Sequence, residues 1–173
     1  MGIRAFAAAN LLEAEYWVVG DGPESESLSM LAQDLGIAQQ VKFWGRLPRE
    51  ETLNKLAECH VLVHPSLHDS GGWVCTEAMG AGRPVICLDL GGPATQVTEE
   101  TGFKIPAESP EQAVQDLAKA IVTLSKEPEL RIRMGEAGKK LVGRSRSWQA
   151  KGEQLAALYE QVTLQEGKNQ CVS

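Results

Sequence analysis

Two carboxylates, Asp69 and Glu77, stand on either side of a glycine pair in the segment 64–96. Gly71 and Gly72 let the backbone approach a ligand closely, and a helix is predicted to begin directly after them. A glycine turn that leads into a helix N-terminus is a ready-made anion site. Asp69 would lie in the loop and Glu77 about one turn inside the helix, so both could face one crevice. The alternative is a helix cap for Asp69 and a solvated face for Glu77.

The elements that must position these carboxylates are two short strands and the helix between them. The β-branched and apolar run at 61–63 predicts a buried strand, which Pro65 and Ser66 end. The helix is predicted to end at Gly80, and the next strand covers 85–88. The carboxyl ends of such strands form the ligand crevice of an open α/β sheet.

Helical and strand patterns alternate over the rest of the chain. Helices are predicted at 3–12, around 28–35, at 50–59, from the Ser109-Pro110 start with a capping-box Gln112, at 130–141 and from Trp148 through Val162. Strands are predicted at 16–19, 41–44 and 102–106. This alternation predicts an α/β fold with a doubly wound, parallel, Rossmann-like sheet. The predicted domain covers 1–164, followed by a polar tail at 165–173.

Composition excludes several classes of protein. The 173 residues fit one domain, and the net charge of −6 argues against nucleic acid as the main partner. The apolar runs are too short for a membrane span, and no signal peptide opens the chain. The four cysteines have no CxxC spacing, and three lie in apolar runs, which favours buried thiols in a reducing compartment. These observations predict a cytoplasmic protein.

The segment 64–96 resembles the donor-binding signature of the retaining GT-B-fold glycosyltransferases of group 1, a large family of glycogen-synthase-like and sucrose-synthase-like enzymes. The matching residues are Pro65-Ser66, Asp69, Gly72, Glu77-Ala78-Met79, Gly82, Pro84-Val85-Ile86 and Gly91-Gly92. The likeness continues in VVGDGP at 18–23, VKFWG at 41–45 and Ser147-Trp148 before the last helix. This chain departs from the family at Asp69, where Glu is usual, and at Gly71, where a bulky residue is common. The resemblance implies the C-terminal, donor-binding domain of such an enzyme.

The resemblance also implies roles in binding a nucleotide-sugar. It assigns Glu77 to the ribose hydroxyls and Asp69 to the donor sugar near the reacting carbon, and these two are the predicted catalytic residues. The amides of the glycine pair at 71–72 would meet the diphosphate or the sugar, and the backbone at 42–44 would pass the base. The predicted donor-binding residues are Gly20, Gly22, Lys42, Phe43, Trp44, Ser66, His68, Gly71, Gly72, Trp73, Glu77, Gly91 and Gly92.

The implied reaction moves a sugar from a nucleotide-sugar to a sugar, lipid-linked or other acceptor with retention of anomeric configuration. No metal and no other cofactor is expected, because Arg and Lys side chains of the family supply the counter-charge. The family's first strand, a loop Arg and a Lys have no match here, and the family's Lys-Gly pair reads Met1-Gly2. Arg46, Arg83 and Lys104 are the nearest cations in sequence, but none matches the motif. The acceptor domain has no match either, so we expect a truncated donor-binding half that is inactive alone.

In the family's strand order the unmatched strand lies between the strand at 16–19 and the strand at 61–64. An open gap would leave backbone groups unpaired, at about 1 to 3 kcal/mol for each buried group. Either the flanking strands close on each other, or a strand from another chain fills the slot and makes an oligomer. Two other functions stay open: a non-catalytic nucleotide-binding partner module completed by another chain, and a sugar-nucleotide epimerase.

Two further patterns allow more than one interpretation. His60, His64 and His68 recur every fourth residue, but they straddle a strand and a proline turn, so a metal site is not predicted. His68 either contacts the donor sugar beside Asp69 or has no role in the site. Between 129 and 151 seven cations accompany two acids. This segment is either a solvated helix face or a weak contact with anionic lipid headgroups, which would place the protein peripherally on a membrane.

Overall fold

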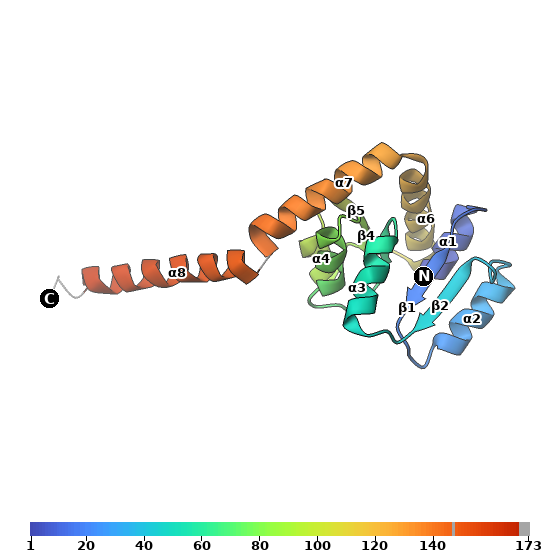
Figure 1. The fold of residues 1–173 in the computed structure, drawn as a ribbon, viewed down its shortest axis with the longest axis horizontal. Helices are drawn as coiled ribbons and strands as arrows, with labels where there is room; N and C mark the ends of the chain where they lie inside the picture. Colours follow the sequence, from blue (N-terminus) through green and yellow to red (C-terminus); the bar gives the residue numbers. More distant parts are fainter. Residues whose placement is uncertain (147, 170–173) are drawn as a thin grey trace.

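The computed structural model describes residues 1–146 and 148–169, with side chains described up to residue 162 and residue 147 left out. The order of elements is α1 (Gly2–Ala9), β1 (Tyr16–Val19), α2 (Ser25–Asp34), β2 (Val41–Gly45), α3 (Arg49–Glu58), β3 (Leu62–His64), α4 (Trp73–Gly80), β4 (Val85–Leu88), α5 (Gly91–Gln96), β5 (Gly102–Ile105), α6 (Pro110–Lys126), α7 (Pro128–Leu141), the π-helical turn η1 (Val142–Arg146) and α8 (Trp148–Asn169) (Figure 1).

The strands pair only in parallel within the described residues, which confirms the predicted α/β class. They form two sheets, β1 with β2 and β3 with β4 and β5. The order within each sheet fits a single larger sheet interrupted between β1 and β3. Of the two alternatives for these flanking strands, the structure does not show the one in which they close on each other.

Helix α1 packs against the first residue of β1. The Tyr16 hydroxyl lies against Gly2 at the start of α1, where a Cβ would also stand 3.4 Å from the Pro65 ring. Phe6 of α1 packs on Tyr16 with 5.3 Å between ring centroids. Burial of this phenol raises the pKa of Tyr16 to about 12. These contacts pack the start of α1 against Tyr16, the first residue of β1.

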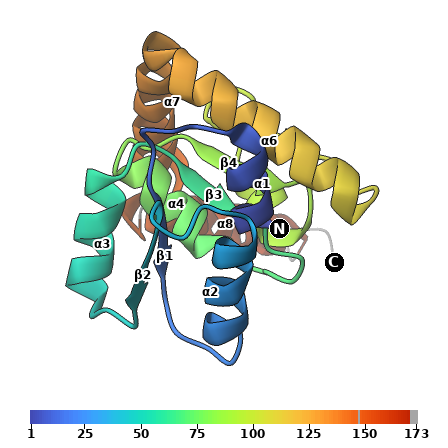
Figure 2. The same ribbon diagram turned by 90° about the vertical axis from the view of Figure 1, so that its right-hand side faces the viewer.

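Helices cover both faces of the three-stranded sheet, as a doubly wound fold requires. Alternate residues of β4 point to opposite faces. Ile86 packs with Leu117 of α6, whereas Val85 packs with Met79 of α4. All four side chains are fully buried. The smaller sheet is flanked by α2 and α3 (Figure 2), with Val41 in the cluster on the α2 side.

Several predicted boundaries need correction. The first helix ends at Ala9 rather than residue 12, because Asn10 takes a left-handed conformation with φ 49°. Helix α5 was not predicted, and β3 begins at Leu62 rather than at residue 61. The Ser109 hydroxyl accepts a hydrogen bond from the Gln112 amide, which confirms the cap. The capping box is incomplete, because the Gln112 side chain donates to Asp116 instead.

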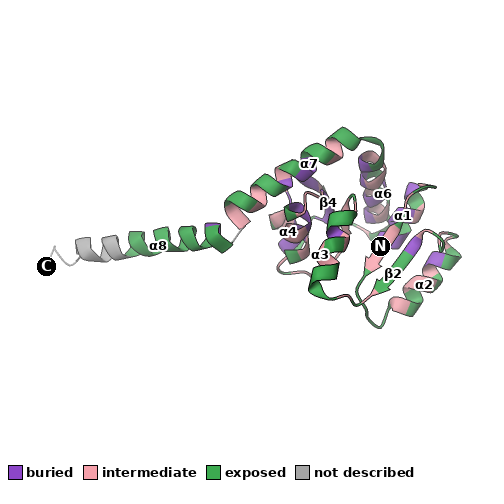
Figure 3. Cartoon of the chain, viewed as in Figure 1, coloured by how far each residue is buried: buried purple, intermediate pink, exposed green. Residues whose placement is uncertain are grey.

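The C-terminal helix α8 extends away from the body of the domain (Figure 1). Its larger described apolar side chains are exposed (Figure 3), with Trp148 87% exposed and Tyr159 64%, whereas Ala150 is buried. The helix forms as predicted, but its apolar spacing does not mark a face packed on this domain. The division into a domain at 1–164 and a tail at 165–173 stays a prediction.

The described residues include no helix with the length and apolar character needed to cross a membrane. They also hold no group of three or more His, Cys, Asp or Glu side chains suited to a metal ion. Their cysteines are free thiols, of which Cys75 and Cys87 are buried and Cys59 is partly buried.

Candidate functional site

The two predicted catalytic carboxylates lie in the segment that follows the carboxyl end of β3. Asp69 lies in the loop after β3, and Glu77 lies in the second turn of α4. Arg49, the first residue of α3 and the end of the loop after β2, contacts Glu77. Its guanidinium Nη2 lies 2.8 Å from Glu77 Oε1, with 77% of the Arg49 side chain and 25% of the Glu77 side chain exposed. This ion pair joins the start of α3 to α4.

Asp69 binds its own loop with both carboxylate oxygens. Its Oδ1 accepts hydrogen bonds from the amides of Gly71 at 3.0 Å and Gly72 at 2.8 Å. Its Oδ2 lies 2.9 Å from His64 Nε2, which donates to it. The Gly72 amide above all holds the pKa of Asp69 below its ordinary value, with help from Gly71 and His64. Asp69 is thus bonded to the two amides that precede α4, a helix whose N-cap residue is Gly72 and which has no side-chain cap.

The two glycine pairs bring two loops into backbone contact. Gly72 has φ 64°, and a Cβ there would stand 2.8 Å from the Pro93 nitrogen. The Gly92 amide donates to the Asp69 carbonyl at 2.8 Å. Gln96 of α5 also donates from Nε2 to the Gly71 carbonyl at 3.2 Å. The loop after β3 is therefore held against the N-terminus of α5, and this close contact explains the glycines without a ligand.

Trp73, Ser66 and His68 surround this loop. The Trp73 indole is 65% exposed and lies over Gly71, where a Cβ would stand 2.8 Å from the ring. Ser66 is half-buried, and His68 is exposed. The histidine that meets Asp69 is His64, which the sequence did not single out for this contact.

The predicted residues of β1 and β2 belong to the smaller sheet, across the break from Asp69. The Gly20 amide donates to the Gly45 carbonyl at 2.8 Å, which ties the loops after the two strands together. Gly20 and Gly22 are exposed, and an added Cβ at either would meet nothing within 4 Å. Phe43 is partly exposed at 39%.

The side chains of Lys42 and Trp44 make contacts within this half of the molecule. Lys42 Nζ pairs with Glu15 at 2.5 Å. Trp44 packs edge-on against Trp17 at 5.7 Å, with Lys55 Nζ 4.3 Å from its ring centroid. The structure thus joins the β1 and β2 residues to one another and brings neither of these two side chains to the Asp69 loop.

The cations named from sequence occupy different places. Arg83 precedes β4 at the amino edge of the sheet, opposite the crevice, where its Nη2 donates to the Ala57 carbonyl. Lys104 lies 3.9 Å from Asp89, and Arg46 is exposed on the loop after β2. Sequence reasoning missed Arg49. A usable signal was present, because a cation in the first turn of a helix opposes the helix dipole and so suggests another partner.

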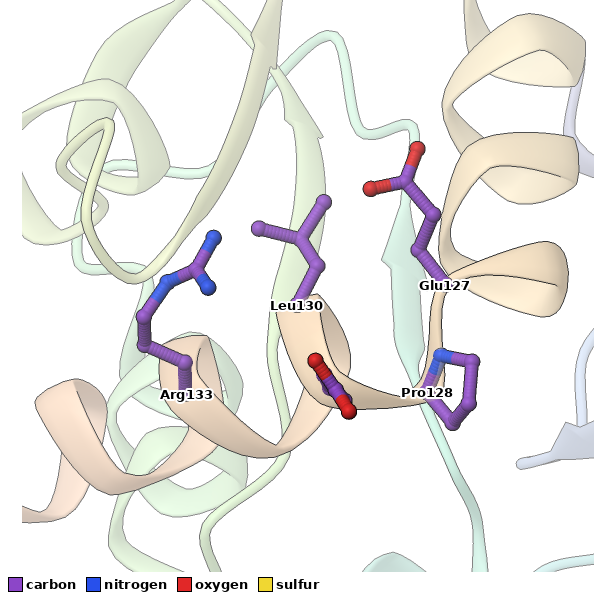
Figure 4. Close-up of a pocket in the computed structure, with 5 residues that line it drawn as sticks. Glu127, Pro128, Leu130 and Arg133 are labelled. Carbon is purple, nitrogen blue, oxygen red and sulfur yellow. The ribbon is translucent and has the colours of Figure 1, made fainter.

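Two surface hollows lie at the amino edge of the sheet. One, at the corner between α6 and α7, is lined by Glu127, Pro128, Glu129, Leu130 and Arg133 (Figure 4). A second is lined by residues that precede β3 and β4, including His60 and Arg83, together with residues of α7. Neither hollow includes Asp69 or Glu77.

Comparison with known proteins places the chain in a family. The model of the family described as "Glycosyl transferases group 1" matches residues 2–141. A D-inositol 3-phosphate glycosyltransferase of Corynebacterium jeikeium is 34% identical over 142 residues, which are 82% of this chain and 33% of that protein. A GDP-mannose-dependent monoacylated alpha-(1-6)-phosphatidylinositol monomannoside mannosyltransferase of Corynebacterium glutamicum is 32% identical over 155 residues, 86% of this chain and 39% of that protein. The chain therefore spans little more than a third of the length of these relatives.

Solved structures show the same fold. Sucrose-phosphate synthase from Thermosynechococcus elongatus matches with a TM-score of 0.77 at 28% identity, over 94% of this chain and 42% of that one. Anabaena HepE in complex with UDP matches with a TM-score of 0.79 at 23% identity, over 92% of this chain and 44% of that one. The chain thus belongs to the group 1 glycosyl transferases and has the fold of the C-terminal domain of their GT-B architecture.

Proposed function

We propose that this chain is the donor-binding domain of a retaining glycosyltransferase and holds a nucleotide-sugar at the crevice beside α4. The observation that carries the proposal is the position of Glu77. Its carboxylate is mostly buried yet open to solvent, on a helix that begins at the carboxyl end of β3. Open α/β sheets bind nucleotides at this edge, and a carboxylate can accept two ribose hydroxyls at once.

The remaining roles follow from the contacts of the loop after β3. Asp69 has two oxygens, each with further lone pairs, so a donor-sugar hydroxyl could share them with the loop amides. We propose that Asp69 fixes the loop and contacts the donor sugar. We propose the exposed Trp73 indole as a wall beside that sugar. Gly20 and Gly22 leave open space at the end of β1 for the nucleotide.

Transfer itself needs groups beyond this domain. The chain aligns with about a third of each curated relative, so the acceptor and its contacts are proposed to lie in a second domain. We expect the 173 residues alone to bind donor without transferring sugar. We also propose that no metal takes part, and that cationic side chains stabilise the leaving diphosphate.

The proposal is tested by calorimetric titration of the chain with UDP and with GDP. Glu77→Ala removes a charged acceptor, and such a loss costs about 1.5 to 3 kcal/mol, or at least about tenfold in affinity. Glu51→Ala is the matched control, because Glu51 is an exposed acid on neighbouring α3. We expect weakened binding for Glu77→Ala alone, with unchanged circular dichroism. Equal affinity of both variants and wild type would reject the role of Glu77.

One observation favours a second candidate function, a nucleotide-binding partner module completed by another chain. The break between β1 and β3 is a place where a further parallel strand could pair on both sides. We propose that a strand from outside these 173 residues occupies it. Such a strand from the same polypeptide would fit an ordinary glycosyltransferase, whereas one from a separate chain would fit the partner module.

A further inference from the structure

Two backbone donors that precede α4 already have an acceptor within their own loop. The amides of Gly71 and Gly72, at the start of α4, both donate to Asp69. A bound diphosphate would meet this carboxylate together with Glu77, so the acids nearest to it are repulsive. A cationic side chain beside Glu77 would offset this repulsion.

The ion pairs of Arg49 and of the other cations near the strand ends differ in their acidic partners. Lys42 pairs with Glu15 on the smaller sheet, and Lys55 pairs with Glu58 at 2.6 Å. Lys104 lies beside Asp89 after β4. Among the lysines and arginines of the described residues, Arg49 is the one that forms an ion pair with either of the two predicted site carboxylates, through Glu77.

We propose that Arg49 is a diphosphate-binding residue that Glu77 holds in place until the nucleotide arrives. This inference rests on the proposed function. When ribose hydroxyls take the Glu77 carboxylate, the guanidinium is released to the diphosphate. Ribose recognition and phosphate binding are then coupled through one side chain.

The move of Arg49 from Glu77 to the diphosphate should cost little free energy. Arg49 is 77% exposed on its side chain, and ion pairs this exposed contribute little stability. Its position in the first turn of α3 is also unfavourable for a cation, because the positive end of the helix dipole lies there. A guanidinium presents a planar fork of donors that matches phosphate oxygens in pairs. The diphosphate is therefore a better partner for Arg49 than either its own helix or a single Glu77 oxygen.

The exchange predicts opposite effects for ligands with and without phosphate. Loss of the guanidinium should lower the affinity for a nucleoside diphosphate, because a charge-assisted contact disappears. The affinity for the nucleoside should stay the same or rise, because Glu77 no longer has a competing partner. Loss of a residue that only shapes the site would change the affinities for both ligands in the same direction.

The experiment compares calorimetric affinities of UDP with uridine and of GDP with guanosine, on the 173-residue chain. The pair that wild type binds is then measured on Arg49→Gln, Arg49→Lys and the control Arg133→Gln, an exposed arginine at the amino edge. We expect Arg49→Gln to lower the affinity for the diphosphate about tenfold. Its affinity for the nucleoside should change less than about twofold or should rise. The control should bind both ligands with wild-type affinity. Arg49→Lys should recover part of the loss, because it keeps the charge without the fork. The dependence of diphosphate binding on salt should also weaken in Arg49→Gln.

Two results would overturn the inference while leaving the proposed function intact. In the first, Arg49→Gln leaves the ratio of the two affinities unchanged although Glu77→Ala weakens both ligands. In the second, Arg49→Gln raises the affinity for the diphosphate, which would mean that Arg49 only competes with the nucleotide for Glu77. Failure of wild type to bind either diphosphate would contradict the proposed function itself, and the coupling with it.

Discussion

Gly72→Ala should destabilise the domain more than a left-handed backbone alone explains. Gly72 has φ 64°, and a Cβ there would stand 2.8 Å from the Pro93 nitrogen and 2.9 Å from the Gly92 carbonyl carbon. An Ala in this conformation costs about 1 to 2 kcal/mol. Overpacking adds about 1 to 3 kcal/mol, because the atoms in contact are backbone and cannot rotate away. The expected loss is therefore about 2 to 5 kcal/mol.

Gly45→Ala separates the two contributions. Gly45 has the same φ of 64°, but a Cβ there would meet nothing within 4 Å. It should lose only the conformational term of about 1 to 2 kcal/mol. Urea unfolding followed by circular dichroism gives both free energies under one set of conditions. Equal losses for the two variants would show that the loop after β3 does not rest on α5, which would remove our explanation of the glycine pairs.

Two further predictions concern the loop and the sheet. The pKa of Asp69 is below the ordinary 3.8 in the folded chain, so its stabilising contribution is present above that value and is lost as the pH falls through the lower folded value. The difference in unfolding free energy between wild type and Asp69→Asn should therefore be larger at pH 7 than at pH 3, and a constant difference would contradict the charged contacts to the Gly72 amide and His64. A chain extended upstream of Met1 by a segment that supplies an apolar strand should be more stable than the 173 residues by about 2 kcal/mol or more, because backbone groups at the break become paired. Equal melting temperatures of the two monomeric chains would mean that the break between β1 and β3 is not a strand site.

Local patterns predicted most elements of this fold. The apolar run of β4, the glycine stop after α2 and the Ser109 cap each act within a few residues, so the sequence reveals them directly. Helix α5 escaped prediction because Gly91, Gly92 and Pro93 are poor helix formers. Its N-terminus is held by the loop after β3 through contacts distant in sequence.

The candidate site was predictable in its carboxylates but not in their partners. Asp69 and the glycine pair form a local turn, in which the carboxylate accepts from the two amides that precede α4. The Arg49–Glu77 pair joins two helices across 28 positions of the chain and follows no periodic pattern. The exposed apolar side chains of α8 have the spacing of a packed helix, and spacing alone does not reveal whether a packing partner lies on the same domain.

The central claim is that nucleotide binds at the carboxyl edge of the sheet, beside α4. Titration of the ¹⁵N-labelled chain with UDP and with GDP, followed by amide NMR shifts, tests it most directly. We expect saturable shifts at Gly71, Gly72 and Glu77, with little change at Leu130 and Arg133 beside the hollow of the amino edge. Shifts confined to the hollow between α6 and α7, or no saturable shift for either nucleotide, would contradict the account.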